Sequence, residues 1–232
     1  MKNIFFPILL IVTMVLTFAL GSWQIERHYE KLEKNKILAK SFDNIDTLPL
    51  EVNNKDHTYH MFNVTGVFDF AKQVAIGPRN VNNQIGRFIY TILYTNDNRT
   101  LLVNRGFVLE DAVNKVNTIG VSKPYNIKVI LIANKGKKWF VPKNNPEKGS
   151  WVYVDTKEIG DFFGDELANY YFNLMQDIGI NDGVKPFISQ ADYKLFNPHY
   201  KYAIFWFSIF FTLLIMILIF YKRRNAKKYK NS

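Results

Sequence analysis

Two long apolar segments, one near each end of the chain, constrain the fold of this sequence more than any other feature. Residues 4–20 carry no charge, and residues 203–221 run uncharged into a basic tail. Each segment approaches the roughly 20 apolar residues that, at a rise of ~1.5 Å per residue, cross a bilayer core of about 30 Å. The sequence therefore predicts an integral membrane protein with two transmembrane helices, at residues 4–22 and 199–221.

The first apolar segment has a second interpretation, as a cleaved signal peptide. Ala19, Leu20 and Gly21 resemble the small-residue site at which such peptides are cut. Against this, the segment is longer than the roughly 7–15 apolar residues of a signal peptide, and only Lys2 precedes it. The second span keeps the protein in the membrane under either interpretation.

The net charge of +10 predicts the topology. Lys2 and the six Lys/Arg residues that follow Tyr221 hold most of the excess, whereas the long middle of the chain is nearly neutral. The positive-inside rule places the basic tail, residues 222–232, in the cytoplasm or the mitochondrial matrix, and two spans then put the N-terminus on the same side. Basic residues between Arg27 and Lys36 argue the other way, but long loops translocate largely regardless of charge.

The middle of the chain is then periplasmic or in the intermembrane space. Because no Arg-rich presequence precedes Ile4, we expect a bacterial cytoplasmic (inner) membrane, with both termini cytoplasmic and a periplasmic central domain. The sequence has no cysteine, which excludes disulfides, thiolate metal sites and covalent haem attachment through Cys-x-x-Cys-His.

Short β-branched and aromatic runs predict a mainly-β domain over residues 49–196, barrel or sandwich, after a helical stalk at residues 23–48. Asp155 with Glu158 has the spacing of a capping box and predicts one helix. The predicted strands are "YHMFNVTGVFDF", "QVAIGPR", "GRFIYTILYT", "TLLVNRGFV", "IKVILIAN", "KWFVP" and "NYYFNLM". The fold class is therefore a β-rich α+β extracytoplasmic domain flanked by two transmembrane helices.

No common catalytic pattern is present, so we expect a protein that is not an enzyme. Gly-x-Ser-x-Gly, His-Glu-x-x-His and a phosphate-binding glycine loop are all missing. His57 and His60 stand three apart where a loop enters a strand, and in an extended chain such residues point to opposite faces. This spacing favours solvated side chains over a metal site.

Arg79 in "GPR" and Arg105 in "NRG" stand beside glycines near predicted strand ends. Arginines so placed can grip carboxylates in a bidentate manner, porphyrin propionates included. Structural ion pairs at turns are the alternative role for both.

His199 has the most informative local chemistry. Asn197 is a favoured N-cap and Pro198 is favoured at the first helical position, so the second span should begin here with His199 in its first turn. Tyr202, Ala203 and Trp206 share its helical face. The positive end of the helix favours neutral imidazole, the form that binds iron, but an interfacial histidine without a ligand fits the same pattern. Trp23 and Trp206 also suit interfacial anchors at the headgroup level.

Five motifs, in order along nearly the whole chain, resemble those of the surfeit locus protein 1 family. They are Gly21-x-Trp23-Gln24-x-x-Arg27, Gly66-x-Phe68-Asp69, Gly77-Pro78-Arg79, Val103-Asn104-Arg105-Gly106, and Asn197-x-His199-x-x-Tyr202 with Trp206. The chain departs from the family pattern at Phe107, Leu109, Ser150 and Phe205. Phe205 replaces a common threonine and removes a hydroxyl near the face of His199.

The resemblance implies an assembly factor for haem-copper cytochrome c oxidase, a chaperone of respiratory chain biogenesis that carries haem a for insertion into subunit I. It implies His199 as the metal ligand, with Trp23, Tyr202 and Trp206 around the macrocycle. The expected partners are subunit I, the haem a synthesis machinery and the lipid bilayer, with no nucleic acid. The alternative is a scaffold that stabilises oxidase subunits without binding haem. Copper delivery by thiolates is disfavoured because there is no cysteine.

Overall fold

The computed structural model describes residues 5–116, 123–137, 139–180, 182–187 and 195–230. The chain forms two compact units. One consists of the N-terminal part of the chain through Lys36 together with the part that begins at Leu195. The other runs from Ile37 to Lys194.

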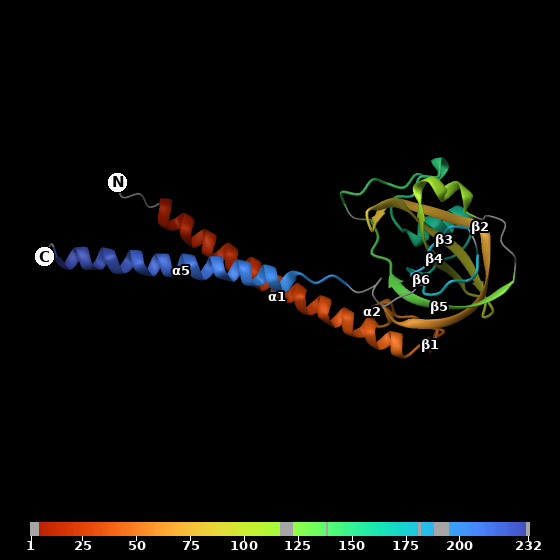
Figure 1. Ribbon diagram of the computed structural model, residues 1–232, viewed down its shortest axis with the longest axis horizontal. Coiled ribbons are helices and arrows are strands. Elements are labelled where there is room, and N and C mark those ends of the chain that lie inside the picture. Colours follow the sequence, from red (N-terminus) through yellow and green to blue (C-terminus); the bar gives the residue numbers. More distant parts are fainter. Residues whose placement is uncertain (1–4, 117–122, 138, 181, 188–194, 231–232) are drawn as a thin grey trace. The chain divides into compact units, whose positions relative to one another are not determined.

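The first unit is a pair of long helices, α1 (Phe5–Asp43) up to Lys36 and α5 (His199–Lys230). Figure 1 shows the two helices running alongside each other. Each is long and apolar enough to cross a membrane, with a mean hydropathy of 2.0 and 2.7 in its most apolar window. Only 11% and 6% of those windows are buried, so these are not core helices of a soluble domain. Apolar helices near both termini that flank a sheet-rich domain confirm the predicted arrangement of elements.

The stalk predicted at residues 23–48 is helical through Asp43, as a continuation of the first apolar helix. α1 continues without a break to Asp43, and the strand β1 (Asp46–Thr47) follows before Pro49. The last two turns of α1 belong to the second unit, where the buried Leu38 packs with Met61 and Ile130.

The second unit is built on one six-stranded sheet that closes on itself. Its strands are β1, β2 (Met61–Val81), β3 (Gln84–Thr95), β4 (Thr100–Leu109), β5 (Pro124–Ala133) and β6 (Tyr170–Leu174). Pairing runs β2–β3–β4–β6–β5 and returns to β2, while β1 adds a short parallel edge to β2. The domain is therefore a small barrel, the first of the two predicted alternatives, and Figure 1 shows the curled sheet.

The length of β2 makes closure possible. Met61–Val67 pairs with β5, and Gly66–Val81 pairs with β3. Irregular pairing between Asp69 and Gln73, and again between Ile76 and Arg79, marks the bulges that bend such a strand. The predicted strands "YHMFNVTGVFDF" and "QVAIGPR" are thus two halves of one element.

Apolar side chains on both faces of the sheet are buried, which explains the nearly continuous apolar run of β4. Leu101 and Val103 contribute to the larger core cluster, while Leu102 between them packs in a second cluster with Trp151 and Ile159. Residues that alternate along a strand point to opposite faces, so both faces of β4 are covered. Ile159 lies on α3 (Thr156–Phe163), the helix that covers the second cluster.

Short helical segments complete the fold. They are α2 (Asn54–His57) and the 3-10 turns η1 (Glu110–Lys115) and η2 (Pro146–Lys148). Asp155 caps α3 by accepting a hydrogen bond from the Glu158 amide at 3.1 Å, which confirms the predicted cap. The strand predicted over "KWFVP" is wrong, because Trp139 and Phe140 lie in an exposed turn.

Candidate functional site

Small and polar side chains of α1 face α5 within the helix pair. Thr17, Gly21 and Gln24 follow one another at spacings of four and three, which puts them on one helical face, and all three are buried. A Cβ on Gly21 would lie 2.8 Å from the Phe207 ring of α5. On α5, Ala203 is buried to 1% exposure. Small residues at this contact let the two backbones approach closely.

Next to this contact, His199 and Gln24 form a hydrogen bond. His199 Nδ1 lies 2.6 Å from Gln24 Oε1. An amide oxygen can only accept, so His199 Nδ1 is the donor in this contact. In the neutral ring with this tautomer, Nε2 would carry the lone pair. No described residue hydrogen bonds to Nε2. Metal-ligating histidines usually donate their other N–H in this way, which fixes the tautomer and the ring orientation.

Trp23 extends the aromatic surroundings of the histidine. Its ring meets the His199 ring edge to face at 6.4 Å between centroids. Arg27, one turn further along α1, places its guanidinium 5.7 Å from the centre of the Trp23 ring. With Trp23 46% exposed, one side of this cluster remains open.

The segment that leads into α5 is fixed to α1 by two asparagine side chains. Asn35 both donates to the Leu195 carbonyl at 3.0 Å and accepts from the Leu195 amide at 2.9 Å. Asn197 donates to the His28 carbonyl at 3.0 Å. The predicted N-cap hydrogen bond of Asn197 is therefore not made by its side chain, and the first helical bond is accepted by Pro198, from Tyr202. His199 does lie in the first turn, as predicted.

Tyr202 and Trp206 have surroundings that differ from those of Trp23, whose ring contacts His199. Tyr202 is 53% exposed and lines a groove of about 720 Å³ with Lys201 and Phe205, and His199 is not among its lining residues. Trp206 is half-buried and contacts Phe205 at 5.5 Å between ring centroids. The structure thus brings His199, Trp23 and Gln24 together, whereas Tyr202 lines the groove beside Lys201 and Phe205.

His57 and His60 belong to the second unit and differ from their predicted arrangement. His57 ends the short helix α2 rather than lying in extended chain, and its ring centroid is 6.2 Å from that of His60. His57 Nδ1 accepts a hydrogen bond from the Asn53 amide at 3.0 Å. Among the described residues, no group of three or more His, Asp or Glu side chains is placed to hold a metal ion.

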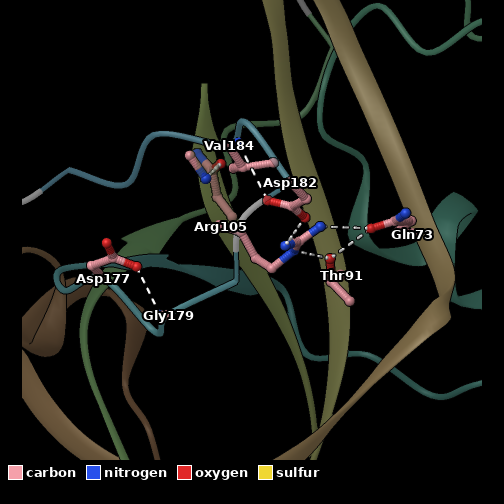
Figure 2. Close-up of polar contacts among 9 residues, drawn as sticks. Gln73, Thr91, Arg105, Asp177, Gly179, Asp182 and Val184 are labelled. Carbon is pink, nitrogen blue, oxygen red and sulfur yellow. Dashed lines mark hydrogen bonds and ion pairs between the residues drawn. The ribbon is translucent and has the colours of Figure 1, made fainter. Parts of the chain in front are cut away.

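Arg105 lies at the centre of a buried polar network of the second unit, shown in Figure 2. Its guanidinium donates to Asp182 at 2.7 Å, to Gln73 at 3.0 Å and to Thr91 at 3.0 Å. The side chains of Arg105 and Asp182 are 2% and 3% exposed. The guanidinium also lies 5.1 Å from the centre of the Phe70 ring. The donors of Arg105 are therefore engaged inside the fold.

Arg79 has a different setting, at the second bulge of β2. Its guanidinium donates to the Val152 carbonyl at 2.6 Å and to the Pro78 carbonyl at 3.0 Å. Both contacts are to backbone oxygens within the second unit, so Arg79 joins β2 to the segment before α3. Its predicted contact with a bound carboxylate stays a prediction.

Comparison with known proteins adds to this geometry. The model of the SURF1 family matches residues 11–211, which include both the α1–α5 contact and the barrel. The chain belongs to the SURF1 family. It is 30% identical to Surfeit locus protein 1 of Xenopus tropicalis, over 87% of this chain and 71% of that protein. It is 24% identical to the SURF1-like protein of Rickettsia bellii over 94% and 91%, and 26% identical to human Surfeit locus protein 1 over 86% and 72%.

Sequence reasoning missed two partners that the SURF1 fold brings into place. Gln24 stood in a quoted motif, but no role followed from it because its partner His199 lies 175 residues away. Asp182 is separated from Arg105 by 77 residues and belongs to none of the motifs. A polar residue one turn after Gly21, at the end of a long apolar segment, is the one signal that could have singled out Gln24.

Proposed function

We propose that this SURF1 family member is a membrane-anchored assembly factor for haem-copper cytochrome c oxidase, and that it holds haem a transiently through His199 before transfer to subunit I. Membership of the family supports the assembly role. The hydrogen bond between His199 and Gln24 is the observation that supports haem binding. In the neutral form of the ring, this hydrogen bond would leave Nε2 available as a ligand.

The residues around His199 fit the ring of a metalloporphyrin. Gln24 orients the imidazole, the open side of Trp23 offers an aromatic surface, and Gly21 keeps the two helices close. Haem a would supply an iron centre, and His199 would hold it through a ring nitrogen. The protein makes and breaks no bond of the porphyrin in this proposal, so it acts as a carrier and not as an enzyme.

The membrane anchor rests on the two apolar helices, and their orientation rests on the basic tail. Both termini are cytoplasmic in this proposal, and the barrel is periplasmic, in the inner membrane of a bacterium. A reporter that is active only outside the cytoplasm should be silent when fused after Ser232 and active when inserted near Asn98, at the turn between β3 and β4. The reverse pattern would contradict the topology.

The presence of a Soret band distinguishes the haem a carrier from the alternative function, a scaffold that does not bind haem. Protein purified from cells that make haem a should carry a Soret absorbance, and protein from cells that cannot make haem a should lack that signal. A colourless protein that still restores oxidase in a deletion strain would favour the scaffold. Under both functions, deletion of the gene lowers oxidase-bound haem a without abolishing haem a synthesis.

A further inference from the structure

A loop of the second unit exposes two large aromatic side chains to solvent. The aromatic loop, residues 134–144, connects β5 to the segment before α3, and the structure describes all of it except residue 138. Trp139 is 92% exposed and Phe140 is 64% exposed. Their rings contact each other edge to face at 5.6 Å between centroids. Such exposure of adjacent large aromatic side chains points to an interaction surface.

The ends of the aromatic loop are fixed by two asparagines. Asn134 donates to Thr156 at 3.3 Å and accepts from the Gly136 amide at 3.1 Å. At the other end the buried Asn144 donates to Glu158 at 2.7 Å and accepts from the Val152 amide at 2.7 Å. These hydrogen bonds fix both ends of the loop, and the two aromatic rings between them lie in solvent and not in the core.

The charge around the aromatic pair is strongly positive. The sequence from residue 134 to 148 contains five lysines and one glutamate. Lys137 and Lys143, on either side of the pair, are both exposed. Tryptophan favours the headgroup region of a bilayer, and clustered lysines are attracted to anionic lipid headgroups. Exposed aromatic side chains beside lysines are therefore the residue types expected in a loop that inserts into an anionic membrane surface.

We propose that the aromatic loop is a third membrane contact of this protein. Trp139 and Phe140 insert at the headgroup level, and Lys137 and Lys143 pair with anionic lipid. This inference rests on the membrane anchoring of the proposed function. Because α1 and α5 join the barrel to the bilayer from both ends of its sequence, a lipid surface stays at high effective concentration near it. An acidic protein surface, the alternative partner for this loop, would have no such permanent proximity and would have to reach the loop by diffusion.

The test uses the full-length chain in vesicles and exploits its lack of cysteine. A cysteine introduced at the exposed Pro142 carries a fluorophore, and the vesicles contain a lipid with a quencher on its headgroup. An equivalent label at the exposed Glu166 is the matched control. We expect quenching at 142 to exceed quenching at 166 several-fold in vesicles rich in phosphatidylglycerol, and to fall in pure phosphatidylcholine.

Two double variants test the chemistry of the contact. Trp139→Ser with Phe140→Ser, and separately Lys137→Gln with Lys143→Gln, should each reduce quenching at 142 to the control level. All four side chains are exposed, so the melting temperature should not change. Equal quenching at both label sites, or quenching that neither double variant reduces, would overturn the proposal. So would a loop that crosslinks to a protein in native membranes and shows no lipid contact.

Alkaline carbonate extraction of the same samples distinguishes this proposal from the one on which it rests. A chain released by carbonate would overturn both the anchor and the loop contact. A chain retained in the vesicles without quenching at 142 would overturn the loop contact alone.

Discussion

Replacing Asp182 by asparagine removes the negative charge that faces the Arg105 guanidinium at 2.7 Å. Both side chains are almost fully buried, so water cannot solvate the guanidinium once its carboxylate partner is gone. Arg105 keeps its hydrogen bonds to Gln73 and Thr91, which are neutral acceptors. Removal of one partner from a buried ion pair costs about 3–5 kcal/mol of unfolding free energy, because the other charge remains uncompensated.

Urea-dependent pulse proteolysis of the full-length protein in detergent would measure this loss. For a slope of about 2 kcal/mol per molar urea, a cost of 3–5 kcal/mol lowers the midpoint by roughly 1.5–2.5 M. Cleavage should be followed within residues 37–194, because the ion pair belongs to that unit. The helix pair then does not contribute to the signal.

The double variant Arg105→Met with Asp182→Leu is the matched control. Replacing a whole buried ion pair by apolar side chains of similar volume is often neutral or stabilising. The midpoint of the double variant should therefore lie well above that of Asp182→Asn. A midpoint shift below about 0.5 M for Asp182→Asn, or a double variant less stable than the single one, would show that the buried ion pair does not stabilise the barrel in this way.

Three further predictions concern the helix pair and the barrel surface. Gln24→Leu removes the acceptor of His199 Nδ1 and should weaken haem retention about 10–100-fold, with rescue by Gln24→Glu, measured by haem transfer to an apo-acceptor. Gly21→Leu should separate the two helices by on the order of 2 Å, seen as a longer distance between spin labels placed on them. The Arg99 guanidinium lowers the pKa of Asp97 through a hydrogen bond. Asp97 therefore contributes stability above about pH 4 that is lost as pH falls through the lowered pKa, so Asp97→Asn should flatten the acid side of the stability profile, by less than about 1 kcal/mol.

The elements of this fold were accessible from the sequence wherever local pattern decides them. Two apolar segments of membrane length, the Asp155 cap and the runs that form β3 and β4 depend on neighbouring residues only. Closure of the barrel was not accessible, because it depends on β2 pairing with both β3 and β5 around its bulges. No local pattern states which strands meet.

The aromatic loop shows how a local pattern fails. Trp139, Phe140 and Val141 have high β-propensity and predict a strand. They lie between Gly136, at a φ of +64°, and Pro142, which has no amide proton to donate. Trp139 and Phe140, which the pattern predicted to be buried, are exposed instead.

The candidate site could be predicted only in part. The position of His199 in the first helical turn followed from Asn197 and Pro198, although Asn197 uses its side chain to bind the α1 backbone. The partnership with Gln24 needs the packing of α1 on α5, which no spacing within either helix encodes.

The most direct test of haem binding through His199 is the Soret spectrum of His199→Ala, purified from cells that make haem a. His57→Ala and His60→Ala are matched controls, because both histidines lie in the other unit. If His199 holds haem a, His199→Ala loses the Soret band or shifts it to a weaker-field form while the protein stays in the membrane, and both controls keep the wild-type spectrum. A His199→Ala protein with the wild-type spectrum and haem content would show that His199 is not the ligand and leave it as an interfacial residue.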